Sequence, residues 1–183
     1  MLQVCRQAAA ARGLVAPLSE QRLETLQCDR APALLFIPSG SFGLLLDDAL
    51  ILRALRHVHA LLAPGGSFLV EAEKLLPQAP ETSGLWGGRW VDRPDGARLI
   101  LSWLTQYSGA PHITSSVHRY ELVKDGKLLA SEYDSFDVRS YASGEFRSLL
   151  QSAGFAHVRE LKPYERADAD ETDDAIVFCA TKA

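Results

Sequence analysis

The chain has 183 residues, of which 47% are hydrophobic and 23% are charged, and its formal net charge at pH 7 is -4. This length suits one well-buried domain, and the composition is that of an ordinary globular protein. Because the charge balance is acidic, we expect neither nucleic acid nor an anionic membrane as a partner.

The three cysteines are Cys5, Cys28 and Cys179, and no two of them have the C-x-x-C spacing of a metal or redox site. An odd and scattered set of this kind indicates reduced thiols. No apolar run is long enough to cross a bilayer, and residues 1–13 lack the pattern of a signal peptide. The sequence therefore predicts a cytoplasmic protein.

The first half of the chain alternates helices and strands. Residues 1–12 predict an alanine-rich helix that ends at Gly13. The apolar run ALLFI at 33–37 predicts a strand buried on both faces. Asp47 is placed to cap the helix that follows, and SFLVEA at 67–72 predicts a second buried strand. Strand, helix and strand joined by short loops indicate a parallel sheet in an α/β protein.

Residues 84–141 have a different texture, rich in β-branched and aromatic residues, and KDGK at 124–127 carries the Asp-Gly signal of a tight hairpin. They predict an antiparallel β insertion, a lid, within a single domain of residues 1–183. A helix capped by Ser143 and closed by Gly154 follows, and then two strands. The acidic loop ERADADETDD between those strands lacks the Gly and the terminal Glu of a calcium loop, so we expect a solvated loop and no metal site.

Several stretches, taken in order, resemble the later part of a class I S-adenosylmethionine-dependent methyltransferase. MLQVCRQAAAARGL is similar to the helix after the family's acidic ribose-binding residue, EQRLETL to the segment after the third strand, and ALLFIPSGSFGLL to the fourth strand with its loop. ALRHVHALLAPGGSFLVE resembles the family's helix, Pro-Gly-Gly turn and fifth strand, while EFRSLLQSAGF and AIVFCATK resemble its last helix and closing hairpin. The resemblance covers nearly the whole chain and implies a Rossmann-like methyltransferase sheet.

Two features of that family are absent from the sequence. The Gly-rich loop after the family's first strand and the acidic residue that ends its second strand would both lie before Met1. The resemblance thus predicts a truncated chain that lacks a strand–helix–strand unit of at least ~30 residues. Strand 33–37 would then be an exposed apolar edge that invites pairing with another chain. A misplaced start codon, a broken gene and a partner chain that completes the sheet, as in a homodimer, all stay open.

The resemblance implies that the cofactor is S-adenosylmethionine. Arg22 and Leu23 match the positions that face its adenine, with Arg22 standing where an acidic residue is common. Strand 67–72 would end near Glu71 and Glu73, which border the reaction site. The loop after strand 33–37 lies at the carboxyl end of the sheet, where α/β proteins bind ligands. Its candidate cofactor-binding residues are Ser39, Gly40, Ser41 and Phe42.

This loop has two interpretations. Gly40 permits close approach of the backbone to a ligand, and Phe42 could cover the ligand. The alternative is an ordinary turn between a strand and a helix.

The inserted segment resembles the lid of small-molecule and sugar N- or O-methyltransferases. Its aromatic side chains could line an acceptor pocket, and its arginines could hold an anionic acceptor. The alternative is a meander core with exposed arginines. Five candidate substrate-binding residues follow from the first interpretation: Trp86, Arg89, Trp90, Arg119 and Tyr120.

No catalytic residue can be assigned from the sequence. His112 and His118 are possible bases, but an isolated histidine on a strand more often belongs to the surface or the core. The predicted function is methyl transfer from S-adenosylmethionine to a nitrogen or oxygen of a small-molecule acceptor. The alternative is a non-catalytic, methyltransferase-like remnant that acts as a dimerising or binding module.

Overall fold

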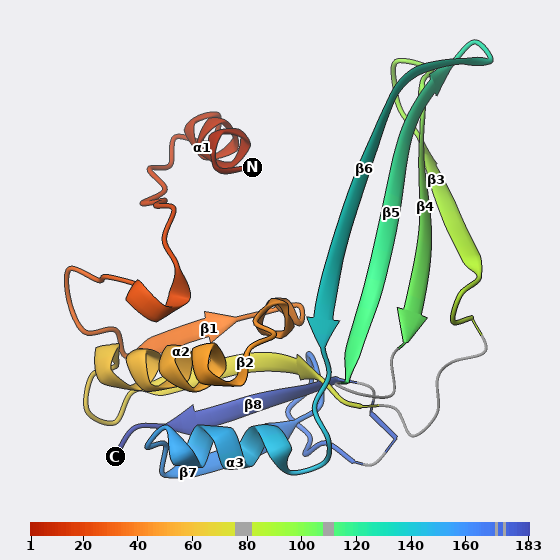
Figure 1. Cartoon of the computed structure of the whole chain (residues 1–183). Coiled ribbons are helices and arrows are strands. Elements are labelled where there is room, and N and C mark those ends of the chain that lie inside the picture. Colours follow the sequence, from red (N-terminus) through yellow and green to blue (C-terminus); the bar gives the residue numbers. More distant parts are fainter. Residues whose placement is uncertain (76–81, 108–111, 171, 174) are drawn as a thin grey trace.

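Two separate β-sheets form the framework of the chain (Figure 1). The computed structural model describes residues 1–75, 82–107, 112–170, 172–173 and 175–183. Within these residues each sheet has four strands.

The first sheet has the strand order β1-β2-β8-β7. Strand β1 (Leu34–Ile37) runs parallel to β2 (Ser67–Glu73), with Leu34 opposite Ser67. Strand β8 (Ala175–Thr181) is antiparallel to β2, and β7 (His157–Leu161) is antiparallel to β8. Strand β1 is therefore an edge of the sheet within the described residues, as the sequence predicts.

Two helices cover one face of this sheet (Figure 1). Helix α2 (Asp48–Leu61) begins where predicted, because the Asp47 carboxylate accepts a hydrogen bond from the Leu50 backbone N–H at 2.7 Å. Helix α3 (Glu145–Ser152) begins differently from the prediction: its N-cap is Gly144, with φ of 75°, and not Ser143. The apolar sides of both helices pack on β2 and β8. Fully buried members of this core include Ile51, Leu55, Val58, Phe68, Val70, Phe146 and Leu150.

The prediction that strand 33–37 is buried on both faces is wrong. Leu35 and Ile37 pack against the core, whereas Leu34 and Phe36 point to the other face and are 51% and 64% exposed. The reason is that α2 and α3 lie on the same side of the sheet (Figure 1). We call the side of the sheet that carries Leu34 and Phe36 the open face.

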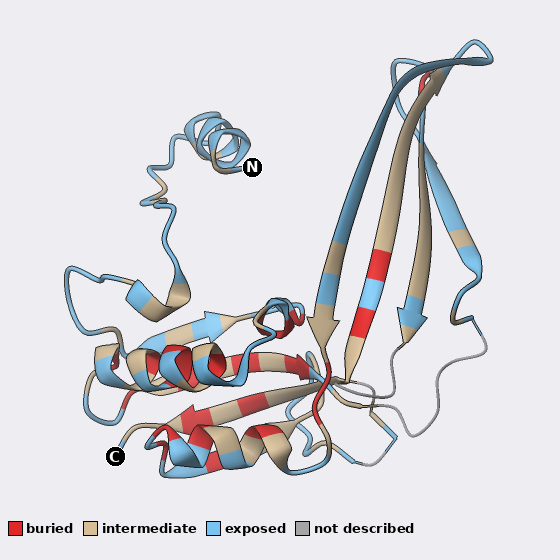
Figure 2. Ribbon diagram, in the orientation of Figure 1, coloured by how far each residue is buried: buried red, intermediate tan, exposed pale blue. Residues whose placement is uncertain are grey.

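The second sheet is an antiparallel meander, β3-β4-β5-β6, that projects away from the carboxyl end of β2 (Figure 1). Its strands are β3 (Trp86–Asp92), β4 (Arg98–Tyr107), β5 (Ile113–Lys124) and β6 (Lys127–Arg139). We call this sheet the arm. Figure 2 shows that most of β3 and β6 is exposed.

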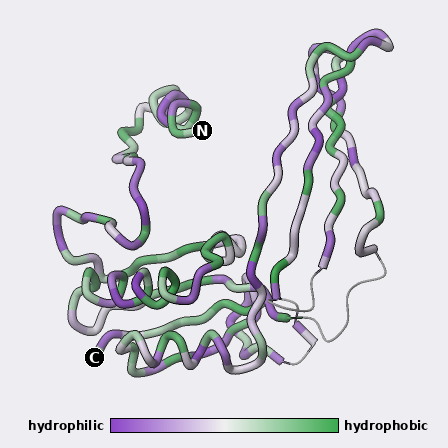
Figure 3. Tube along the Cα trace, in the orientation of Figure 1, coloured by the Kyte–Doolittle hydropathy of each residue, from purple (hydrophilic) through white to green (hydrophobic). Residues whose placement is uncertain are grey.

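The predicted hairpin lies at the tip of the arm. Asp125 and Gly126, with φ of 51° and 70°, turn the chain between β5 and β6. Both residues adopt the left-handed region that a tight hairpin needs, which explains the Asp-Gly pair. The turn itself is hydrophilic (Figure 3).

The N-terminal part of the chain lies away from the sheets. Helix α1 (Leu2–Ala10) forms as predicted and has no buried residue (Figure 2). After it the chain reaches a short 3-10 helix, η1 (Leu23–Thr25), beside α2. The His57 ring on α2 lies 2.7 Å from the Leu26 carbonyl oxygen, which ties this segment to the domain.

Candidate functional site

The carboxyl ends of β1 and β2 meet at a turn that is held by a carboxylate. The Ser39 backbone N–H donates a hydrogen bond to Glu71 Oε2 at 3.1 Å. Gly40 has a φ of 64°, and a Cβ placed there would lie 3.5 Å from Glu73 Oε1. The Ser39–Gly40 turn therefore sits directly against two glutamates of β2.

These two glutamates affect each other. Glu71 and Glu73 are two residues apart on one strand, so both project from the same side of β2. Desolvation of its carboxyl group, followed by the negative charge of Glu71, raises the pKa of Glu73. The pair can attract a cationic group, and Glu73 can hold a proton at a higher pH than an ordinary glutamate can.

The other two residues of the predicted loop have different surroundings. Ser41 begins the 3-10 helix η2 (Ser41–Leu44). Phe42 is only 1% exposed, and its ring centroid lies 5.3 Å from that of Phe146. The expectation that Phe42 covers a ligand is wrong, because its side chain is part of the core beneath α3.

The side chains of Arg22 and Leu23 also have different surroundings in the structure. Leu23 begins η1 and packs against the core. The Arg22 side chain is 85% exposed and lies 4.0 Å from Glu24. Arg22 is thus a solvated side chain here, whereas Leu23 offers an apolar surface.

The five predicted acceptor residues lie on two faces of the arm. In the strand register, Trp86, Trp90 and Arg119 project from one face, and the guanidinium of Arg119 lies 5.6 Å from the Trp86 ring centroid. Arg89 and Tyr120 project from the opposite face, because they alternate with those residues along β3 and β5. The five side chains cannot line one pocket.

Distance along the strands separates these residues further. We take the row Tyr107–Thr114–Val138 as the base of the arm, because Val138 contacts Gly43 of the first sheet's loop region. Arg119 is five residues beyond Thr114, or about 17 Å along the strand. Trp90 pairs through Ile100 with Glu121, about 24 Å from the base. Of the predicted set, Trp86 and Arg119 are therefore the two that share a face of the arm and lie nearest to its base on that face.

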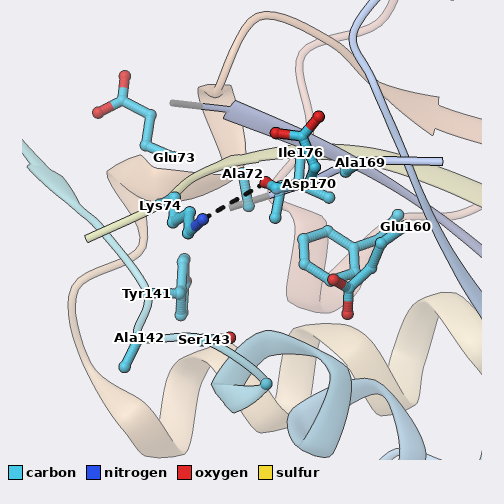
Figure 4. Close-up of a pocket in the computed structure, with 12 residues that line it drawn as sticks. Ala72, Glu73, Lys74, Tyr141, Ala142, Ser143, Glu160, Ala169, Asp170 and Ile176 are labelled. Atoms are coloured by element: carbon cyan, nitrogen blue, oxygen red, sulfur yellow. Dashed lines mark hydrogen bonds between the residues drawn. The ribbon is translucent and has the colours of Figure 1, made fainter. Parts of the chain in front are cut away.

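A cavity of about 160 Å³ lies between the end of β2 and the start of α3 (Figure 4). Its lining includes Lys74, Ser143, Glu160 and Tyr141. The Tyr141 hydroxyl is buried and has no hydrogen-bond partner among the described residues. Burial raises the pKa of this phenol well above its ordinary value. Tyr141 could not be singled out from the sequence, since one tyrosine before a helix has no distinctive pattern.

Arg139 joins the arm to the domain. It ends β6, its guanidinium donates to Asp48 at the start of α2, and it also donates to Glu145 of α3 at 2.7 Å. The same guanidinium lies 5.2 Å from the Tyr141 ring centroid. The arm is thus fixed at its base by charged hydrogen bonds to both helices.

Two further properties bear on the class of site. No helix in the described part of the chain is long and apolar enough to span a membrane. Among the same residues, no three histidine, cysteine, aspartate or glutamate side chains gather as metal ligands would. Glu171 and Asp174 of the predicted acidic loop lie outside the described residues.

Comparison with known proteins gives matches only among solved structures. No protein-family profile matches the chain, and no curated protein sequence is similar to it. An S-adenosylmethionine-dependent methyltransferase from Clostridium acetobutylicum superposes with a TM-score of 0.80 at 15% identity, over 100% of this chain and 71% of that one.

Two sugar-modifying enzymes are also similar. CalS10, an amino pentose methyltransferase from Micromonospora echinaspora with S-adenosylmethionine bound, has a TM-score of 0.69 at 16% identity, over 89% of this chain and 63% of that one. The sugar N-methyltransferase KedS8 from Streptoalloteichus has a TM-score of 0.74 at 16% identity, over 96% of this chain and 66% of that one. The chain thus spans slightly less than two thirds of these two structures.

These similarities define the class of fold. The chain has the α/β fold of class I S-adenosylmethionine-dependent methyltransferases, with part of the Rossmann-like sheet and an antiparallel β insertion. The resemblance drawn from the sequence is confirmed at the level of the fold.

Proposed function

We propose that this chain transfers a methyl group from S-adenosylmethionine to a nitrogen or oxygen of a small-molecule acceptor. The observation that carries the proposal is the Ser39–Gly40 turn against Glu71 at the carboxyl end of β1, in a sheet with the methyltransferase strand order. Ligands of open α/β sheets bind at this end of the strands. The three cysteines, none of which is in a disulfide, support a cytoplasmic location for the reaction.

The residues of the turn fit this cofactor. S-adenosylmethionine supplies a methyl group on a positively charged sulfur atom. Glu71 and Glu73 offer negative charge for such a group, and Gly40 leaves the backbone open beside them. Leu23 offers an apolar surface for a base, whereas solvated Arg22 contributes little.

The acceptor is proposed to lie between this turn and the lower part of the arm. The sugar and amino pentose methyltransferases among the similar structures support an acceptor of sugar size. Trp86 and Arg119 stay in the proposal as acceptor contacts. Glu73 is the proposed proton acceptor for a nitrogen nucleophile, because its raised pKa brings its proton affinity closer to that of an amine.

The first test is calorimetry of S-adenosylhomocysteine with this chain. We expect binding, and we expect Gly40→Ala to weaken it, because the new methyl group would occupy the space beside Glu73 in which the proposal places the cofactor. Gly126→Ala is the matched control, since Gly126 also has a positive φ, of 70°, but lies at the tip of the arm with nothing within 4 Å. A folded sample that gives no heat with the ligand would remove the proposal for this chain.

A second candidate function follows from the open face. Exposed Leu34 and Phe36 on an edge strand are typical of a surface that associates with another chain. A non-catalytic module that dimerises or binds a partner would use that surface and would not bind S-adenosylhomocysteine. The same calorimetry therefore separates the two candidates.

A further inference from the structure

The open face of the first sheet is apolar and hollowed. Leu34, Phe36, Leu69 and Val177 contribute to a depression of about 210 Å³, with Tyr164 at its margin. Cys179 projects from the same face, because it pairs with Leu69 and alternates with buried Phe178 and Ala180 along β8. Figure 3 shows that β1 is hydrophobic along its length.

Helix α1 is the second apolar element without a packing partner. None of its residues is buried, and Val4 is 67% exposed. The segment after it leaves Leu14 and Val15 62% and 96% exposed. A short helix of this kind is not stable on its own in water, so it needs an apolar surface to pack on.

The exposed area indicates that something covers these elements. A compact monomer of 20.0 kDa exposes about 8,700 Å². This chain exposes 12198 Å², roughly 3,500 Å² above the compact value. Part of the excess belongs to the projecting arm. Each copy in an obligate homodimer contributes about 1,000–2,500 Å² to the interface, which this excess can supply.

Charge favours α1 as the element that covers the open face. Residues 1–18 contain Arg6 and Arg12 and no aspartate or glutamate. The end of β2 that borders the depression carries Glu71, with Glu73 two residues beyond it. An N-terminal segment with two arginines and no carboxylate side chain, placed on an apolar surface with an acidic margin, satisfies both the hydrophobic and the electrostatic requirement.

We propose that the chain forms a two-fold homodimer in which α1 of each copy packs on the open face of the other copy. One symmetric exchange covers both apolar elements of both chains. This inference does not depend on methyl transfer and holds equally for a non-catalytic module.

The first test measures the mass of the chain by light scattering. We expect twice the chain mass of 20.0 kDa. In the double variant Leu34→Thr with Phe36→Thr, we expect the dissociation constant to rise at least about 100-fold, because four large side chains leave the interface. Threonine suits a strand, so the variant should keep the circular dichroism of the parent.

A matched control distinguishes the open face from the arm. Leu128 and Leu129 at the tip of the arm are each 57% exposed. The double variant Leu128→Thr with Leu129→Thr should leave the dimer intact. A monomeric parent chain, or a dimer that survives the Leu34 and Phe36 changes, would overturn the proposal.

The second test uses the native thiols. In a Cys28→Ser background, a short bismaleimide should join Cys5 of one copy to Cys179 of the other, and Cys5→Ser should abolish the product. A cross-link between Cys5 and Cys179 within one chain would show that α1 folds back on its own sheet. That result, or a folded dimer without any Cys5–Cys179 product, would exclude the exchange.

Discussion

Replacing Arg139 with methionine should weaken the attachment of the arm to the domain. The Arg139 side chain is only 13% exposed and donates to two carboxylates, Asp48 and Glu145. Methionine keeps much of the apolar stem but removes the charge and every donor. Glu145 still accepts a hydrogen bond from the Ala142 backbone N–H at 2.8 Å, so it does not lose all its partners.

The magnitude follows from the exposure of each partner. Asp48 is 81% exposed, so its pair with Arg139 contributes at most about 1 kcal/mol. Glu145 is 28% exposed, and its charged hydrogen bond contributes about 2 kcal/mol. We expect Arg139→Met to lower the free energy of unfolding by about 3 kcal/mol, which corresponds to a fall in Tm of about 6–12 °C.

The assay is urea unfolding followed by two signals. All three tryptophans, Trp86, Trp90 and Trp103, lie in the arm, so their fluorescence reports on the arm alone. Circular dichroism at 222 nm reports mainly on the helices. In the variant we expect the midpoints of both transitions to move to lower urea concentration. The midpoint of the tryptophan signal should lie below that of the circular dichroism signal.

A control variant isolates the effect of position. Arg98 also pairs with an aspartate, Asp92 at 2.7 Å, and also lies over an aromatic ring, Trp90 at 5.5 Å. Its pair is solvent-exposed near the tip of the arm, so Arg98→Met should leave both transitions unchanged. A surface substitution usually changes the free energy of unfolding by no more than about 0.5 kcal/mol. If Arg139→Met changes it by no more than that, Arg139 does not hold the arm.

Three further predictions concern the core and the titrating groups. Phe146 is 1% exposed among three aromatic rings, so Phe146→Ala should cost about 3–5 kcal/mol in urea unfolding. Desolvation beside Phe155 lowers the pKa of His59 in the folded chain. As the pH falls, the unfolded chain therefore binds a proton at this histidine at a higher pH than the folded chain does. Stability should fall as the pH drops below about 6.5, and His59→Gln should flatten that part of the pH curve. For Glu73, whose folded pKa is raised, the stability contribution is present at low pH and is lost as the pH rises. Glu73→Gln should therefore unfold at higher urea than the parent at pH 7.5 but not at pH 4, while lowering any methyl transfer.

The parts of the fold that the sequence predicted are those with local signals. Asp47 caps α2, and Asp125 with Gly126 makes the hairpin, because each of these choices depends on a few neighbouring backbone groups. The expectation of a Rossmann-like methyltransferase sheet followed from the resemblance and not from periodicity. Short apolar runs such as ALLFI indicate a strand but do not show which strands lie beside it in the sheet.

The errors concern non-local packing. Whether both faces of β1 are buried depends on where α2 and α3 cross the sheet, and no residue within 33–37 encodes that. Phe42 lies two residues after Gly40, in a loop where the resemblance implies cofactor binding, yet its ring packs in the aromatic core beneath α3. Ser143 has the right chemistry for a cap, but Gly144 occupies the position because the chain needs a φ of 75° there.

The candidate acceptor residues illustrate the same limit in the arm. Odd and even positions along a strand face opposite sides, so the separation of Trp86 and Trp90 from Arg89 was available from β3 alone. Placing Arg119 with Trp86 and Tyr120 with Arg89 required the register across β4, which the sequence does not give. The cavity at Tyr141 required still more, since its lining comes from the end of β2, the segment before α3, β7, the β7–β8 loop and β8.

The geometry of the arm limits where the proposed acceptor could be bound. Side chains near Trp90 lie about 24 Å from the base along the strands, so they cannot contact a group held at the Ser39–Gly40 turn. Contacts from the arm to such a group must come from its lower rows or from a bend at its base. Arg139 fixes that base to both helices, and Glu145 also accepts from the chain that enters α3. The position of the arm is therefore set by the same charged group that borders Tyr141, so loss of Arg139 should disturb acceptor binding more than binding at the turn.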